Sequence, residues 1–165
     1  MGPLPLTLIS LGCVPEIKIR RADFGEPVVQ ALLVDVLSEL AERYGGTGDD
    51  TPIGADDFTP PAGAFFVADD GERLVGCAGW RRHGDDAELK RMYTARAIRG
   101  RGLGRRMLAT IEESAREAGC RRVILETGDR QPEAIALYES AGYRRIEDFG
   151  YYRGHEGVLS FGRDL

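Results

Sequence analysis

The sequence lacks most of the features that would quickly assign it to a class. Of its 22 basic residues only Lys18 and Lys90 are lysines, and the formal net charge is −5. An acidic balance of this kind argues against nucleic acid as an obligate partner. Residues 4–14 are apolar, but they are fewer than the about 20 that a membrane helix needs. No basic region precedes them, so neither a membrane contact nor a targeting signal is expected.

Cysteine and histidine are also scarce. Cys13, Cys77 and Cys120 are widely separated, and no pair has the spacing of a zinc or redox motif. A reducing, cytoplasmic setting is therefore expected. His83 and His155 stand alone, so no metal site is predicted. The sequence has no G-x-S-x-G segment, which excludes the nucleophile elbow of the α/β-hydrolases.

The length of 165 residues predicts one domain, and 42% hydrophobic residues are enough for a sizeable core. We assign residues 1–15 to an N-terminal extension and residues 16–165 to the domain. The extension is expected to pack either as an extra strand or against a second subunit. The second arrangement would make the protein a homodimer.

Hydrophobic periodicity predicts the order of the elements. Strands are expected at residues 16–21, 64–68, 73–82, 87–94, 122–127, 143–149 and 158–163, and helices at 26–44, 103–118 and 132–141. Asp70-Gly71 is a strong hairpin signal, and residues 45–63 are expected to form a long loop with room for a short helix. This order indicates a mixed α/β fold built on one sheet.

The most informative segment is residues 99–108, which lie between an expected strand and an expected helix. Gly100, Gly102 and Gly104 alternate there with other residues, four of which are arginines. Glycine allows positive φ and close approach of a ligand to the backbone. A tight turn that opens into a helix leaves N–H groups unpaired, and the helix dipole adds positive potential. The segment therefore predicts a phosphate-binding turn.

The spacing of this turn excludes two common nucleotide-binding motifs. Position 105 is arginine where the dinucleotide fingerprint needs glycine, and no Lys-Ser or Lys-Thr pair follows as a P-loop requires. Arg99, Gly102 and Gly104 instead fit the pattern [QR]-x-x-G-x-[GA]. Downstream, residues 134–143 fit A-x-x-L-Y-x-x-x-G-[FY].

These two motifs, in this order, resemble the signatures of the GNAT superfamily, the acyl-CoA-dependent N-acyltransferases. The resemblance covers residues 16–165. It implies an α/β (α+β) fold with a single mixed, mostly antiparallel sheet flanked by helices. It also implies acetyl-CoA as co-substrate and no metal.

The resemblance further implies which residues contact the coenzyme. They are Met92, Tyr93, Thr94, Arg99, Gly100, Arg101, Gly102, Leu103, Gly104, Arg105, Gln131 and Tyr138. The main chain of residues 92–94 is expected to pair with the pantetheine arm and to stabilise the oxyanion. Gln131 departs from the family, because relatives often carry asparagine there.

Tyr138 and Glu88 are the predicted catalytic residues. In the family a tyrosine at the position of Tyr138 lies beside the thioester sulfur and acts as general acid; the alternative is a core aromatic. A free amine has a pKa of about 10.4 and arrives protonated, so a base is needed. Glu88, eleven residues before Arg99, lies where several family members place that base. The alternative is a strand residue paired with Lys90 on the same face.

Three functions remain open from the sequence. The first is transfer of an acetyl group to a primary amine of a small molecule or peptide, and Tyr138 and Glu88 favour it. The second is a non-catalytic acyl-CoA-binding regulatory module. The third is an acyltransferase with another acyl chain or a hydroxyl acceptor. Free-thiol release would separate the first from the second.

The sequence says less about the acceptor. Residues 45–63 carry four aspartates and no basic residue. These aspartates either attract a cationic amine or are simply the solvated side chains of an exposed loop. Trp80 and the Tyr151-Tyr152 pair are candidates for the acceptor pocket or for ordinary packing. Cys77 lies among small residues and is expected to be a core thiol rather than a nucleophile.

Overall fold

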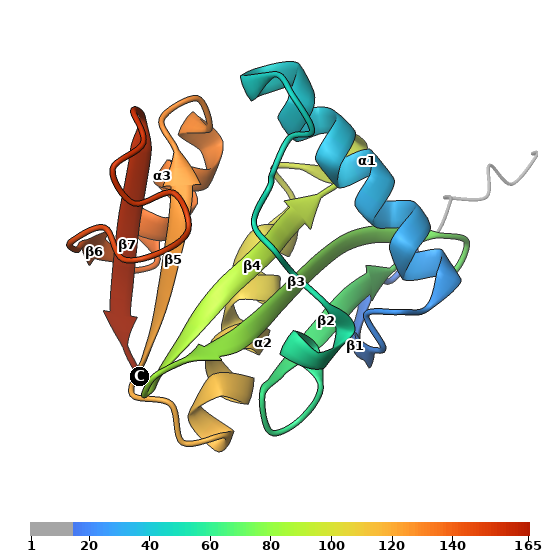
Figure 1. Ribbon diagram of the computed structural model, residues 1–165. Coiled ribbons are helices and arrows are strands. Elements are labelled where there is room, and N and C mark those ends of the chain that lie inside the picture. Colours follow the sequence, from blue (N-terminus) through green and yellow to red (C-terminus); the bar gives the residue numbers. More distant parts are fainter. Residues whose placement is uncertain (1–14) are drawn as a thin grey trace, which may run out of the picture.

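A computed structural model describes residues 15–165 (Figure 1). The prediction for the N-terminal extension concerns residues that lie outside this described part, except for residue 15. In this described part, seven strands form one sheet in the order β1-β2-β3-β4-β5-β7-β6. Within residues 15–165, β4 and β5 are the one parallel pair, and every other neighbouring pair is antiparallel. The prediction of a single mixed, mostly antiparallel sheet is confirmed.

The elements follow the predicted order closely. The strands are β1 (Lys18–Ala22), β2 (Gly63–Asp69), β3 (Leu74–His83), β4 (Asp86–Thr94), β5 (Arg122–Gly128), β6 (Arg144–Arg145) and β7 (Val158–Asp164). The helices are α1 (Pro27–Tyr44), α2 (Leu103–Glu117) and α3 (Pro132–Ser140), with two short 3₁₀ turns, η1 (Ala55–Phe58) and η2 (Arg96–Ile98).

One predicted strand was wrong in extent. Of residues 143–149 only Arg144 and Arg145 form a strand, which pairs with β7. Gly154 and Gly157, both at a φ of +80°, help the chain turn back over β5 as a loop. The pattern of residues 143–149 therefore predicted too long a strand, because only Arg144 and Arg145 pair with a neighbouring strand.

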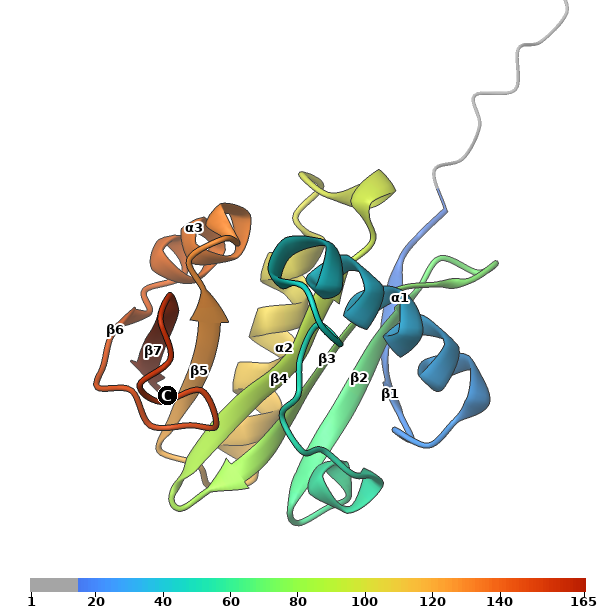
Figure 2. The same ribbon diagram turned by 45° about the horizontal axis from the view of Figure 1, so that its top comes forward.

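The helices cover both faces of the sheet, as Figures 1 and 2 show. Along β2, Phe65 and Val67 belong to the hydrophobic core under α1 and η1, whereas Phe66 and Ala68 belong to the core under α2 and α3. This alternation follows from the strand period of two. It also defines the two faces used below, which we call the α1 face and the α2 face.

Helix α2 is held by a stripe of apolar side chains on its sheet side. The buried stripe consists of Leu103, Met107, Leu108, Ile111 and Ala115. Trp80 of β3 packs in the same core and donates its indole N–H to Ser114 Oγ at 2.9 Å. Of the two alternatives for Trp80, the structure therefore supports packing.

The two halves of the sheet separate between β4 and β5. Residue pairing between these strands covers only Ala87 with Val123 and Glu88 with Ile124. Beyond that point β4 pairs with β3 alone and β5 with β7 alone. A bulge in β4 places Arg91 at a φ of +55° and increases the divergence. One edge of the β4 main chain is therefore left free of strand partners.

Candidate active site

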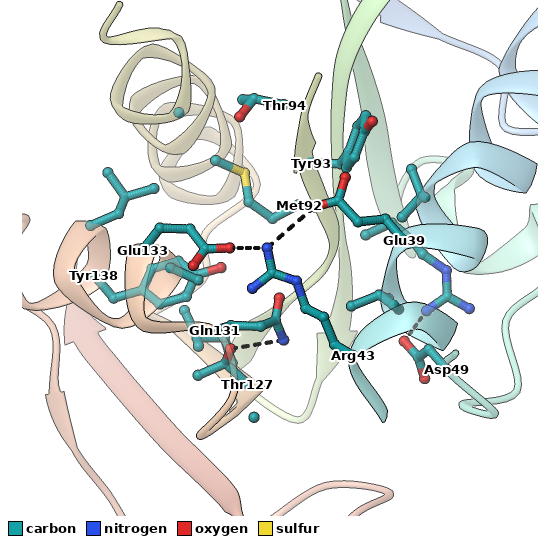
Figure 3. Close-up of a pocket in the computed structure, with 18 of the residues that line it drawn as sticks. Glu39, Arg43, Asp49, Met92, Tyr93, Thr94, Thr127, Gln131, Glu133 and Tyr138 are labelled. Atoms are coloured by element: carbon teal, nitrogen blue, oxygen red, sulfur yellow. Dashed lines mark hydrogen bonds and ion pairs between the residues drawn. The ribbon is translucent and has the colours of Figure 1, made fainter. Parts of the chain in front are cut away.

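A cavity of about 580 Å³ lies between the diverging strands, within the usual range of small-molecule sites. It is lined by parts of β4, β5, α1, α2, α3 and the loop before β7 (Figure 3). The cavity brings together most of the residues predicted to bind the coenzyme: Met92, Tyr93, Thr94, Arg99, Gly100, Gly102, Leu103, Gly104, Arg105, Gln131 and Tyr138. Arg101 is exposed and is not part of the lining.

The N-terminus of α2 opens into this cavity. Gly102 caps the helix in the left-handed region, with a φ of 80°, and no side chain caps the first turn. The first helical hydrogen bond runs from Arg106 N–H to Gly102 O, so the N–H groups of residues 103–105 have no acceptor within the helix. A Cβ at Gly104 would lie 3.2 Å from Leu137 Cδ2, which shows that this glycine permits α2 to pack against α3.

The arginines of the turn differ in their contacts. The Arg99 guanidinium donates to Thr94 O at 2.9 Å and to Glu39 of α1 at 2.7 Å, so part of its charge is already neutralised. Arg105 donates to Ser140 Oγ at 2.7 Å. The sequence could not reveal the pairing of Arg99, because Glu39 lies 60 positions earlier in the chain.

Tyr138 projects from α3 into the cavity, and Figure 3 shows its ring directed toward the centre. The residue is 5% exposed and packs against Tyr143 with ring centroids 5.8 Å apart. Burial raises the pKa of Tyr138 above its ordinary value of 10, so the phenol stays protonated at neutral pH. It is therefore a core aromatic that also lines the cavity, with its phenol protonated. Gln131, at the start of the same helix, donates to Thr127 Oγ1 at 3.4 Å.

Glu88 is buried and held by two cations. Its Oε2 accepts from Arg81 Nε at 2.8 Å, and its Oε1 lies 3.0 Å from Lys90 Nζ. Burial alone would raise the pKa of Glu88, but Lys90 and Arg81 outweigh it and the pKa lies below the ordinary value. Glu88 is not among the residues that line the cavity.

Glu126 of β5 does line the cavity, and the sequence analysis missed it. Its side chain is 3% exposed, and its Oε1 accepts from the N–H of Tyr152 at 3.1 Å. Its Oε2 accepts no hydrogen bond from the described residues. Burial raises the pKa of Glu126 above the ordinary value, against the opposing effect of Lys90. The sequence did contain a signal for it, because Glu126 is the one carboxylate in the otherwise mostly apolar strand at residues 122–127.

Comparison with known proteins places the chain in a family. Residues 33–143 match the acetyltransferase (GNAT) family. The chain is 34% identical over 147 residues to an IAA acetyltransferase from Azospirillum brasilense, which covers 84% of this chain and 92% of that protein. The chain belongs to the GNAT family. It is accordingly an acyltransferase of the N-acetyltransferase type.

Solved structures share the fold of this GNAT chain. A Klebsiella pneumoniae protein described as an acyl-CoA N-acyltransferase has a TM-score of 0.74 and 26% identity, over 90% of this chain and 97% of its own. A GNAT acetyltransferase from Elizabethkingia anophelis, solved with acetyl-CoA bound, has a TM-score of 0.64 and 17% identity, over 90% and 98% of the two chains. A GNAT protein with this fold has therefore been solved with the coenzyme bound.

The cavity of this GNAT chain is crossed by a bridge between α1 and α3. Arg43 Nη2 forms ion pairs with Glu133 on α3 and, at 3.3 Å, with Glu39 on α1 (Figure 3). Arg43 also donates to Arg130 O, and Arg130 donates to Arg43 O, both at 3.0 Å. These contacts tie the end of α1 to the loop before α3. They form a roof over the gap between β4 and β5.

The loop that follows α1 reaches the other end of the cavity. Asp49 forms an ion pair with Arg91 of the β4 bulge and accepts from Tyr152 Oη at 2.8 Å. Asp57 lies 3.7 Å from Arg81. Two of the four loop aspartates are thus neutralised by arginine, and the loop offers less free negative charge than the sequence suggests. Tyr152 lines the cavity, whereas Tyr151 is exposed.

Other candidates do not add chemistry to the site. Cys77 is fully buried, and burial raises the pKa of its thiol to about 12, as expected of a core cysteine. Among residues 15–165 no group of three or more metal-binding side chains is placed to hold an ion. In that same part of the chain no helix is long and apolar enough to cross a membrane.

Proposed function

We propose that the protein transfers the acetyl group of acetyl-CoA to a primary amine of a small molecule or peptide. One observation carries the proposal. The unpaired edge of β4, the open N-terminus of α2, protonated Tyr138 and buried Glu126 all face the same cavity. A regulatory module that only binds the coenzyme needs the first two features but not the last two.

The coenzyme fits the geometry of the cavity. The free N–H groups of α2 suit the pyrophosphate, because a helix N-terminus stabilises anions. The free edge of β4 suits the amide-rich pantetheine arm, which can pair with it like an added strand. That arrangement leads the thioester from the N-terminus of α2 toward Tyr138 and Glu126.

The reaction that we propose is direct attack on the thioester. The amine nitrogen forms a bond to the carbonyl carbon, and the carbon–sulfur bond then breaks. Main-chain N–H groups of residues 92–94 stabilise the oxyanion. Tyr138 gives its proton to the leaving thiolate, and a carboxylate takes the proton that the amine must lose.

Two carboxylates can be the base, and the structure favours Glu126. Burial raises its pKa, which suits a base that must hold the proton it takes from the amine, and Glu126 is the one of these two carboxylates that lines the cavity. Glu88, the residue predicted from the sequence, forms ion pairs with both Arg81 and Lys90 and does not line the cavity. Its role as base stays a prediction, as do the cytoplasmic location and the homodimer.

The test is a panel of amines incubated with acetyl-CoA, followed through the release of free thiol. We expect turnover with at least one primary amine and none with hydroxyl analogues of the same shape. Glu126→Gln should lower kcat by about 10²-fold or more, the usual scale of general base catalysis. Glu88→Gln should retain most of the rate. Coenzyme binding without thiol release from any acceptor would favour the regulatory module.

A further inference from the structure

A row of alternating charges runs across the α1 face of the sheet and ends at the cavity. It consists of Glu126 on β5, Lys90 and Glu88 on β4, and Arg81 on β3. Lys90 Nζ lies 3.9 Å from Glu126 Oε2 and 3.0 Å from Glu88 Oε1. Glu88 Oε2 in turn accepts from Arg81 Nε at 2.8 Å. From the cavity inward, the charges of the row are therefore negative, positive, negative and positive.

The strand geometry explains why these four residues share one face. Leu89 of β4 and Leu125 of β5 pack in the core of the α2 face, so their neighbours in sequence point to the α1 face. Glu88 is the register partner of Arg81 in β3. Toward β5, Glu88 is also the last residue of β4 that still has a strand partner.

Lys90 and Glu126 each lie two residues beyond the last β4–β5 pair, Glu88 with Ile124, where the two strands diverge. Their side chains are 6% and 3% exposed, so the row is almost dry. An isolated charge in such a place is costly, and removal of one partner leaves the other uncompensated. The stability of each charge therefore depends on its neighbours in the row. The protonation of Glu126, at the end that meets the cavity, depends on Lys90 and Glu88.

We propose that Lys90 and Glu88 are positioning residues that hold Glu126 at the cavity wall and set its protonation through this row of charges. The inference rests on the proposed function, in which Glu126 is the base. It gives Glu88 a role that differs from the predicted one, because Glu88 acts through Lys90 and touches no substrate. Arg81 anchors the far end of the row.

The other groups around Glu126 do not supply an equivalent charge. The loop before β7 contributes the N–H of Tyr152 and, from β7, Ser160 is the register partner of Glu126. Asp49 and Arg91 are paired with each other. The remaining charged or titratable side chains on the α1 and loop walls of the cavity are Glu39, Arg43, Tyr44, His155 and Glu156, with the phenol of Tyr152. Lys90 is the cation that forms an ion pair with Glu126 among the described residues.

The row makes two predictions of opposite sign. Lys90→Met removes the positive neighbour and should raise the pH at which Glu126 loses its proton by about one unit or more. Glu88→Gln removes a negative neighbour and frees Lys90 for Glu126, so it should lower that pH. Lys90→Arg keeps the charge and should stay close to the parent protein. A role in packing alone would not produce shifts of opposite sign.

The experiment uses two readouts on the full chain. Carbon-13 NMR of labelled glutamate carboxyls follows the protonation of Glu126, assigned by its loss in Glu126→Gln. The acidic limb of kcat/KM against pH follows the active base. The double variant Lys90→Met with Glu88→Gln removes both charges of the Lys90–Glu88 ion pair, so neither residue is left charged without the other. The acidic limb of its kcat/KM profile should lie at a pH between the limbs of the two single variants.

The outcomes separate the inference from the proposed function. If both readouts move in the expected directions, both are supported. If the NMR shifts appear but the acidic limb stays in place, the row is real and the assignment of Glu126 as base is wrong. If Lys90→Met and Glu88→Gln leave the protonation of Glu126 unchanged, or move it the same way, the inference is overturned. Should one single variant not fold, the other decides against Lys90→Arg, since Lys90→Met must raise and Glu88→Gln must lower the pH at which Glu126 loses its proton, and no shift would overturn the inference.

Discussion

Arg43 at the end of α1 and Glu133 at the start of α3 form an ion pair across the cavity, over the gap between β4 and β5. The two residues belong to helices on opposite faces of the sheet. The pair is reinforced by two reciprocal hydrogen bonds at 3.0 Å, in which the guanidinium of Arg43 donates to Arg130 O and that of Arg130 donates to Arg43 O. The guanidinium groups of Arg43 and Arg130 therefore hold the roof of the cavity together.

We expect Arg43→Gln to destabilise the fold, because this half-buried side chain connects α1 with α3. A loss of about 1 kcal/mol corresponds to a decrease in Tm of about 2–4 °C for a chain of this size. Arg116→Gln is the matched control, since Arg116 forms an exposed pair with Glu113 on one helix and such pairs contribute little. Equal Tm changes in the two variants would mean that the bridge contributes no more than a surface pair.

Gly102→Ala tests the coenzyme-binding turn. Gly102 and Gly119 both have positive φ, 80° and 78°, and a Cβ at either would meet open space. Each alanine variant should cost about 1–2 kcal/mol through the left-handed backbone. Only at Gly102, however, does the Cβ enter the cavity, so we expect about tenfold weaker acetyl-CoA binding by calorimetry. Unchanged affinity in Gly102→Ala, or an equal loss in Gly119→Ala, would contradict the assignment.

Tyr138→Phe tests the general acid. Removal of the hydroxyl should lower kcat by about 10²-fold or more, with little change in the affinity for acetyl-CoA. Tyr143→Phe is the control, because Tyr143 is also buried and donates to Glu112 at 3.0 Å outside the cavity lining. It should lower Tm and leave kcat nearly unchanged. Turnover of Tyr138→Phe at the parent rate would reduce Tyr138 to a packing role.

Cys77→Ala tests direct transfer against an acyl-enzyme route. A thiol whose pKa is raised to about 12 is almost entirely protonated at neutral pH and is a poor nucleophile. We expect the variant to keep most of its activity, and initial-rate lines for the parent enzyme to intersect rather than run parallel. Parallel lines, or an inactive but folded variant, would indicate a covalent intermediate instead.

The stability of Glu126→Gln should depend on pH. The pKa of Glu126 in the fold is raised above 4.5, so the ionised carboxylate lowers stability at neutral pH and this cost disappears as pH falls through the folded pKa. The variant should therefore have a higher Tm than the parent at pH 7, by about 2 °C or more, and the difference should vanish below pH 4.5.

Glu88→Gln should show the opposite sign. The pKa of Glu88 in the fold is lowered, so its ionised form stabilises the protein above the ordinary pKa of 4.5, and that stability is lost as pH falls through the folded pKa. The variant should have a lower Tm than the parent at pH 7. Tm values that change in the same direction for both variants would be inconsistent with the environments described here.

The sequence by itself determined the parts of the site that depend on local geometry. Gly102 and Gly104 define the turn into α2, because positive φ and close helix packing at these positions can be read from glycine spacing. The motif around Tyr138 likewise placed a tyrosine on the helix that faces the cavity. The order of elements followed from periodicity, except for residues 143–149.

Only the tertiary structure decided which carboxylate faces the cavity. Glu88 and Glu126 both lie on strands and on the same face of the sheet, so local pattern treats them alike. The difference arises because β4 and β5 part directly after Glu88 pairs with Ile124. Glu88 stays enclosed between Arg81 and Lys90, whereas Glu126 lies one step further along, at the opening. Strand divergence depends on contacts between distant segments, and no short stretch of sequence encodes it.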